Sequence, residues 1–191
     1  MACLAMHLAI AKKYVQNNPS LDFEVYQKGA YLPDVSSDKF NAHYGIKMPV
    51  KTVKDMLDSK IDIKRCAKDL DLTVELNRAV FLHLVTDYLF YNFVYSEELE
   101  TKTPEQITQM MYQDYDYVTD YVVKKYGITI PQEISHLVQS KSGNIKSMFF
   151  DPESTDKFVS LASQFNLDKV KVQIIASPTD FLNNFLSQLN K

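Results

Sequence analysis

Three short motifs in the second half of the chain each place a proline directly after a helix-capping residue. They are Thr103-Pro104-Glu105-Gln106, Asp151-Pro152-Glu153 and Ser177-Pro178-Thr179-Asp180. A Thr, Asp or Ser side chain at this position accepts hydrogen bonds from the first helical turn, and proline already has the backbone angle of a helix start. We therefore expect a helix to begin at each motif. The first should end at Gly127, because glycine readily adopts the left-handed conformation that stops a helix.

Helical spacing of apolar residues extends through much of the rest of the chain, which has only four glycines. Further candidate helices are residues 2–17, 50–60, 72–95 and 131–141. The third of these is long and largely apolar, with Asp71 as its expected N-cap. Residues 169–176 alternate in polarity and favour a short strand. The sequence nevertheless predicts an all-α fold, a single-domain multi-helix bundle over residues 1–191.

Residues 21–49 separate the first two predicted helices and have a different character. They mix short apolar groups with Gly29, Pro33, Gly45 and Pro49. We therefore expect a long, mostly irregular segment here. A loop of this length inside a compact domain is usually functional.

The composition excludes some classes of protein and sets an expected location. Hydrophobic residues make up 46% and charged residues 24% of the chain, an ordinary balance for a soluble protein. The net charge is −3, and no long basic run indicates nucleic-acid binding. Cys3 and Cys66 form no paired motif, so we expect no disulfide. Neither a signal peptide nor a membrane-spanning stretch is visible, which makes the cytoplasm the expected location.

Two polar residues interrupt the apolar stretch FLHLVTDYLFYNFV, residues 81–94. They are His83 and Asp87, which lie four positions apart and therefore share one helix face. A buried polar pair must be satisfied, either by a hydrogen bond within the core or by a shared metal ion. The pair alone does not decide between these two interpretations.

Two further histidines add weight to the metal interpretation. His7 lies among apolar residues in the first predicted helix, and His43 lies in the irregular segment that also contains Asp34. Three of the four histidines thus have apolar surroundings or another candidate ligand nearby. A metal site would also explain the long segment, because coordination can order a loop that packs poorly by itself.

The order and spacing of these residues resemble a known family. His7 begins HLAIAKKY, the segment GAYLPDVSSDKFNAHYG contains Asp34 and His43, and HLVTD contains His83 and Asp87. The set is similar to the zinc-dependent phospholipase C family, whose wider superfamily includes the S1/P1-type nucleases. The resemblance covers roughly the first half of the chain.

This resemblance implies an all-α fold and a cluster of two, and up to three, zinc ions that cleaves phosphodiesters. Asp34, His43, His83 and Asp87 would surround one ion. Asp87 would bridge to a second ion that His7 also binds. A set of imidazoles and carboxylates suits Zn²⁺, and a site rich in oxygen would also accept Mn²⁺ or Fe.

The second half of the family pattern is different in this chain. Phe93 stands where the family has a further histidine on the long helix, and no later H-x-x-x-E motif follows. The helix expected to end near Tyr126 offers acidic residues instead, of which Asp116 is the preferred extra ligand because tyrosines surround it. A solvated acidic face is the alternative. His136 has no ligand-type partner one turn away, so we expect it at the surface.

Two functional hypotheses follow. The first is a cytoplasmic, metal-dependent hydrolase, a phosphoesterase of phospholipase C type, acting on a small phosphorylated or phospholipid-like substrate. Asp34 would orient or deprotonate the attacking water. The second is a non-catalytic helical protein that keeps a structural or vestigial metal site. A phosphohydrolase of the HD type ranks lower, because it requires adjacent His and Asp, which this chain lacks.

Overall fold

The computed structural model describes residues 3–138 and 151–190. Within these ranges the chain forms eleven α-helices and two short 3₁₀ helices, and it contains no strand. The predicted all-α, multi-helix fold is therefore confirmed. The buried apolar side chains of these helices form one hydrophobic core.

The helices of the described residues vary widely in length. They are α1 (Leu4–Asn17), α2 (Phe23–Gly29), α3 (Leu32–Val35), α4 (Lys39–Ala42), α5 (Val53–Asp58), α6 (Ile63–Asp69), α7 (Glu75–Val94), α8 (Pro104–Tyr126), α9 (Pro152–Ala162), α10 (Leu167–Ala176) and α11 (Pro178–Leu189), with 3₁₀ helices at Glu97–Thr101 and Gln132–Leu137.

All three proline motifs begin helices as predicted. The Thr103 side chain accepts a hydrogen bond from the backbone N–H of Gln106, whose side chain in turn accepts one from the Thr103 backbone. Asp151 and Ser177 cap α9 and α11 in the same manner. Gly127 ends α8 with a φ of 57°, the left-handed conformation that glycine adopts without strain.

The predicted strand at residues 169–176 is wrong, because this stretch belongs to α10. Asn166 caps the helix by accepting a hydrogen bond from the backbone of Lys169. Val170 and Ile174, one helical turn apart, are buried, whereas Val172 between them is 68% exposed. The alternating polarity therefore conceals a helix with a narrow apolar face.

Two other sequence expectations also need correction. Asp71 does not cap α7. It accepts hydrogen bonds from Thr73 in the preceding turn, and α7 begins after Val74. The candidate helix at residues 131–141 is a 3₁₀ helix ending at Leu137, and its last residues lie outside the described part of the chain.

The segment expected to be mostly irregular, residues 21–49, contains the short helices α2, α3 and α4. Side chains cap two of them, since Asp22 accepts from the backbone of Glu24 and Asp38 from that of Asn41. Such brief helices have no apolar periodicity to reveal them in a sequence.

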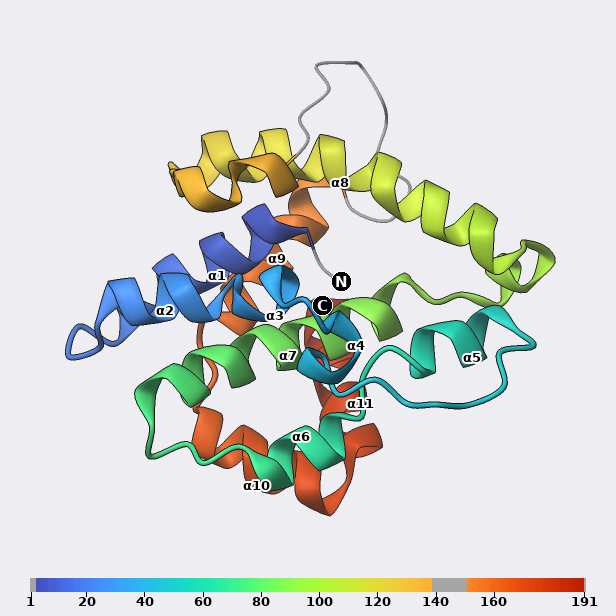
Figure 1. Cartoon of the computed structure of the whole chain (residues 1–191), viewed down its shortest axis with the longest axis horizontal. Coiled ribbons are helices and arrows are strands. Elements are labelled where there is room, and N and C mark those ends of the chain that lie inside the picture. Colours follow the sequence, from blue (N-terminus) through green and yellow to red (C-terminus); the bar gives the residue numbers. More distant parts are fainter. Residues whose placement is uncertain (1–2, 139–150, 191) are drawn as a thin grey trace.

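Helix α7 crosses the middle of the molecule (Figure 1) and contacts α1, α2, α5, α6, α10 and α11. Its closest neighbour is α2, where Gly29 lies directly against Ala79. A Cβ atom on Gly29 would come within 2.3 Å of the Ala79 Cβ atom. Absence of that atom lets the two helices approach closely. None of the helices in the described ranges combines the length and the apolar character needed to span a bilayer.

Candidate metal centre

Five predicted ligands meet in the interior, where α1, α7 and the α3–α4 segment converge. His7 comes from α1, Asp34 from α3, and His43 ends α4, while His83 and Asp87 lie one turn apart on α7. All five side chains are buried, and Asp87 has no exposed surface. Buried charged and polar groups in such a cluster require compensation by one another or by a bound ion.

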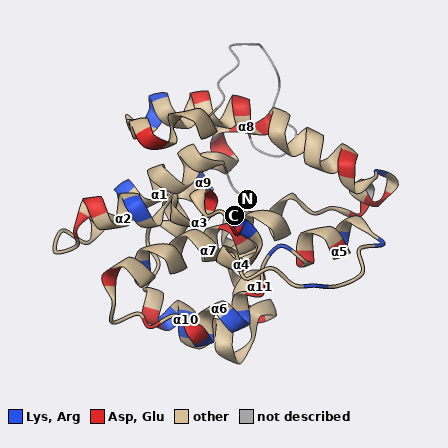
Figure 2. Ribbon diagram, in the orientation of Figure 1, with Lys and Arg blue, Asp and Glu red and all other residues tan. Residues whose placement is uncertain are grey.

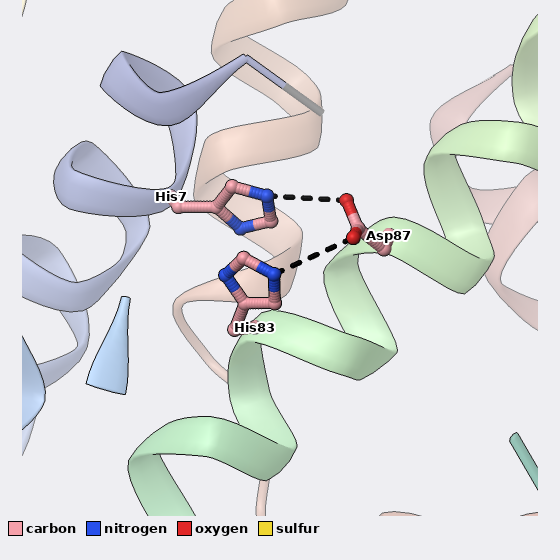
Figure 3. Close-up of side chains that lie close together, drawn as sticks. All are labelled: His7, His83 and Asp87. Carbon is pink, nitrogen blue, oxygen red and sulfur yellow. Dashed lines mark hydrogen bonds and ion pairs between the residues drawn. The ribbon is translucent and has the colours of Figure 1, made fainter. Parts of the chain in front are cut away.

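The two oxygens of Asp87 each face one imidazole (Figure 3). The His7 Nε2 atom is 3.1 Å from Asp87 Oδ1, and the His83 Nε2 atom is 3.4 Å from Asp87 Oδ2. The two imidazole rings stack with their centroids 3.8 Å apart and an interplanar angle of 16°. Asp87, on α7, thus links this helix to α1 through His7, whose ring lies nearly parallel to that of His83.

His43 brings the α3–α4 segment to the same point. Its Nε2 atom lies 3.3 Å from the Nε2 atom of His83. The same atom is 3.3 Å from Asp34 Oδ1 and 3.5 Å from Asp87 Oδ2. Two nitrogens and two oxygens therefore converge, with the described separations all between 3.3 and 3.5 Å.

These four distances, of the six that four atoms define, have the length of the edges of a tetrahedral zinc site. Zinc binds imidazole nitrogen and carboxylate oxygen at about 2.0–2.1 Å, so tetrahedral ligands lie about 3.3–3.4 Å from one another. Two groups of side chains have the mutual distances that a metal requires, one formed by His7, His83 and Asp87 and the other by Asp34, His43 and His83. The four converging atoms draw on both groups.

Backbone carbonyls fix the orientation of two of these imidazoles. The Nδ1–H group of His83 donates to the carbonyl of Ala30, and that of His43 donates to the carbonyl of Lys39, both at 2.8 Å. In the neutral form, each ring then presents an unprotonated Nε2 atom to the cluster. Metal-binding histidines commonly have this outer hydrogen bond.

The four converging atoms are then all hydrogen-bond acceptors. Lone pairs at these distances repel one another unless a positive charge lies among them. That charge can be a metal ion or protons on the imidazoles. Asp34 Oδ1 has no hydrogen-bond donor although it is buried, which is the expected state of an atom that binds a cation.

The pKa shifts of the cluster residues indicate which of them are charged in the folded protein. Burial lowers the pKa of His7 and so favours its neutral form. Burial would raise the pKa of Asp34, but the nearby imidazoles of His43 and His83 lower it. Burial likewise opposes the ionisation of Asp87, yet the nearby imidazoles are among the groups that hold its pKa well below the usual value. Ionised carboxylates are the form that binds metal.

His83 shows the opposite tendency from His7. Burial would lower its pKa, but the charge of Asp87 and the interaction with this carboxylate raise it. Without a metal, His83 therefore takes a proton more readily than His7. A bound cation would displace that proton.

A cavity of about 960 Å³ reaches the cluster at Asp34. One wall is a single face of α8, from Pro104 to Thr119, and includes Tyr112 and Tyr115. Lys39, the first residue of α4, also lines the cavity. The volume is sufficient for a ligand of nucleotide or larger size.

Lys39 and the two tyrosines on α8 were not predicted from the sequence. The signal for Lys39 was its position four residues before His43, on the same helical turn. Asp116, the proposed extra ligand, is half-buried on the cavity wall and belongs to neither of the two groups found among the described residues.

Four other residues that the sequence drew attention to also have defined positions. His136 is exposed, as expected, and lines the cavity rather than the cluster. Phe93 packs edge-on against Phe158, away from any ligand role. Cys3 and Cys66 are free and buried, and burial raises the pKa of the Cys3 thiol to about 11.

No family model matches this chain, and neither a curated protein nor a solved structure matches it.

Proposed function

We propose that this protein is a metal-dependent phosphoesterase with a metal centre of the zinc-dependent phospholipase C type. One observation carries the proposal: the His43 Nε2 atom lies 3.3–3.5 Å from His83 Nε2, Asp34 Oδ1 and Asp87 Oδ2, and a cavity of about 960 Å³ reaches Asp34. A buried cation site that reaches a ligand-sized cavity is the arrangement required for metal-assisted hydrolysis.

Zinc is the proposed metal, because two imidazoles and two carboxylates suit it, although Mn²⁺ or Fe would also fit such a set. Asp34, His43, His83 and Asp87 would hold the first ion. A second ion would bind between His7 Nε2 and the other oxygen of Asp87. With only two of the described side chains as ligands, this second site would be the weaker one.

The residues around the site have separate proposed roles. A bound ion would polarise a phosphoryl oxygen and lower the pKa of a water molecule to about 7. Asp34, at the junction of cluster and cavity, would orient that water and accept its proton. The two carbonyl-anchored imidazoles would keep the ligand geometry fixed while the substrate binds.

Lys39 is the proposed phosphate-binding side chain. It lines the cavity, and its own backbone carbonyl holds the ring of His43. A substrate phosphate would therefore lie between a positive ammonium group and the metal centre. Lysine is suited to this role as a point charge for phosphate.

The decisive experiment is hydrolysis of bis-p-nitrophenyl phosphate and p-nitrophenyl phosphate by the zinc-loaded protein. Asp34→Asn should reduce kcat by about 10²–10⁴-fold, the usual contribution of a general base. Lys39→Ala should mainly raise KM. His136→Ala, a change at a cavity-lining histidine outside the two candidate metal groups, is the matched control and should retain activity. No hydrolysis with zinc, manganese or iron would overturn the proposal.

A structural metal site is the second candidate function. Four protein ligands around one ion would leave no open position, and closed sites of this kind are typical of structural zinc. Under this alternative, the ion raises thermal stability but no phosphate ester is cleaved. Asp34→Asn would then change metal affinity alone.

A further inference from the structure

The cavity that reaches the candidate metal centre offers few positive groups to a phosphate. Lys39 is the only lysine or arginine among the described residues that line it. Helix α8, which forms one wall, has acidic residues along its length and lysines only in its last turn (Figure 2). Carboxylates repel a phosphate. Any favourable contact from α8 must therefore come from a neutral hydrogen-bond donor.

Four side chains of α8 with such donors form one stripe along the cavity. Thr108, Tyr112, Tyr115 and Thr119 all line it, and their spacings of four, three and four residues place them on one helix face. Exposure decreases toward the end of the stripe, because Tyr112 is 60% exposed, Tyr115 is half-buried and Thr119 is only 5% exposed. Tyr115 is therefore the aromatic donor at which this wall passes from the open cavity into the interior.

Ring contacts hold Tyr115 against the helix that carries Asp87. The centroid of its ring lies 6.0 Å from that of Phe90 and 5.7 Å from that of Tyr112, which meets it edge-on at 81°. Phe90 comes three residues after Asp87 on α7, so the two share one side of that helix. The ring of Tyr115 thus lies between the exposed part of α8 and the turn of α7 that carries the shared carboxylate.

The Tyr115 phenol is neutral in this position. Burial raises its pKa well above the usual value, and groups near it, Asp87 among them, raise the pKa further. The effect of Asp87 also indicates that the hydroxyl is close enough to the candidate metal centre to interact with it electrostatically. A neutral phenol can donate a hydrogen bond to an anion without repelling it.

We propose that the Tyr115 hydroxyl donates a hydrogen bond to a phosphoryl oxygen of the substrate. The inference rests on the proposed phosphoesterase function and adds a catalytic residue to it. Lys39 on α4 and Tyr115 on α8 would hold the same phosphate from two helices. Phosphoryl transfer spreads negative charge over the phosphoryl oxygens, and a fixed neutral donor stabilises that charge. The proton stays on the phenol throughout.

Replacement of Tyr115 by phenylalanine keeps the ring and removes only the hydroxyl. Tyr115→Phe should reduce kcat for bis-p-nitrophenyl phosphate by about 10²-fold, as loss of one fixed donor commonly does, while metal content and Tm stay unchanged. Tyr117→Phe makes the same change on α8 at a residue that does not line the cavity and should retain the native kcat. A native kcat in Tyr115→Phe, or loss of metal together with activity, would overturn the proposal.

Binding of inorganic phosphate gives a second measurement that does not depend on hydrolysis. Isothermal calorimetry would compare the zinc-loaded native protein with both variants. We expect Tyr115→Phe to bind phosphate about tenfold more weakly, because it lacks one hydrogen bond to a charged group, and Tyr117→Phe to bind it as the native protein does.

The two measurements separate this inference from the proposed function. If the native protein cleaves no ester but Tyr115→Phe binds phosphate more weakly, the proposed function fails and the Tyr115 contact is supported. If the native protein binds no phosphate, or if Tyr115→Phe binds it equally well, the contact is overturned even when esters are cleaved.

Discussion

His83 illustrates how a single side chain connects the fold to the proposed chemistry. Its Nδ1–H group binds the carbonyl at the end of α2, and its Nε2 atom faces Asp87 and His43. The ring thus links three segments of the chain. The sequence predicted its pairing with Asp87, because residues four apart share a helix face. The role of Ala30 could not be predicted, because it depends on how closely α2 approaches α7.

His7 determines whether the proposed centre binds one metal ion or two. Its ring stacks on that of His83, and its Nε2 atom faces Asp87 Oδ1, the oxygen that does not face His83 and His43. We expect His7→Ala to remove the weaker ion and to leave one ion per chain, whose affinity falls by about 10–100-fold. Metal titration by isothermal calorimetry measures both effects. His136→Ala is the control, and complete loss of metal in His7→Ala would contradict this assignment.

At the scale of helices, the sequence correctly predicted those helices that begin at a capping motif or have a long apolar face. The three proline motifs and the helices at residues 2–17 and 72–95 belong to this group. Helix α6 and the short helices α2, α3 and α4 were not predicted, because each has seven residues or fewer and is stabilised by local caps and tertiary contacts. The same limit explains why Asp34 and His43 were assigned to a loop.

The contact between α2 and α7 depends on the absence of a side chain at Gly29. An added Cβ atom would meet both the side chain and the backbone of Ala79, so one helix must move. We expect Gly29→Ala to destabilise the protein by about 1–3 kcal/mol and to weaken metal binding, because Ala30 would shift away from His83. Chemical denaturation and metal titration provide the two measurements. Unchanged values in both would show that the contact is not tight.

Helices α8 and α9 are joined at Asp156, which accepts hydrogen bonds from Tyr121 and Tyr126 at 2.8 and 2.7 Å. Partial burial would raise the pKa of Asp156, but these hydrogen bonds and Lys125 lower it. A lowered folded-state pKa means that the stabilisation is present above the unfolded-state pKa and is lost as pH falls through the folded-state value.

We therefore expect Asp156→Asn to reduce the free energy of unfolding at pH 7 by about 1–2 kcal/mol. The difference between native and variant proteins should shrink below a pH of about 4. Urea denaturation at several pH values measures this difference. Asp151→Asn, a change at an exposed helix cap, is the comparison variant. A difference in the free energy of unfolding between native protein and Asp156→Asn that is constant with pH would contradict the assigned hydrogen bonds.

At the scale of the whole molecule, the proposed metal centre connects segments that are distant in sequence. Residues 7, 34, 43, 83 and 87 come from α1, the α3–α4 segment and α7, so a bound ion stabilises the folded chain and not the unfolded one. The sequence indicated these five residues as candidate ligands by their type and order. It did not predict the cavity, since its wall is a face of α8 whose position depends on the packing of the whole bundle.

Metal removal should therefore destabilise the protein globally. A ligand present at 1,000 times its Kd stabilises the folded state by about 4 kcal/mol, which corresponds to roughly 8–16 °C in Tm for a chain of this size. We expect chelation to lower Tm by this order and added zinc to restore it, as measured by differential scanning calorimetry. The His83→Ala variant should be insensitive to the chelator. A native Tm that is unaffected by chelation and by zinc would count against the metal centre.

The most direct test of the metal centre is the metal content of the untagged protein, measured by elemental mass spectrometry for the native chain and for His83→Ala. We expect at least one zinc, manganese or iron ion per native chain and its loss in the variant. A native protein without metal, even after incubation with zinc or manganese, would mean that protons alone hold His83 and Asp87 together. The proposed phosphoesterase would then lose its basis.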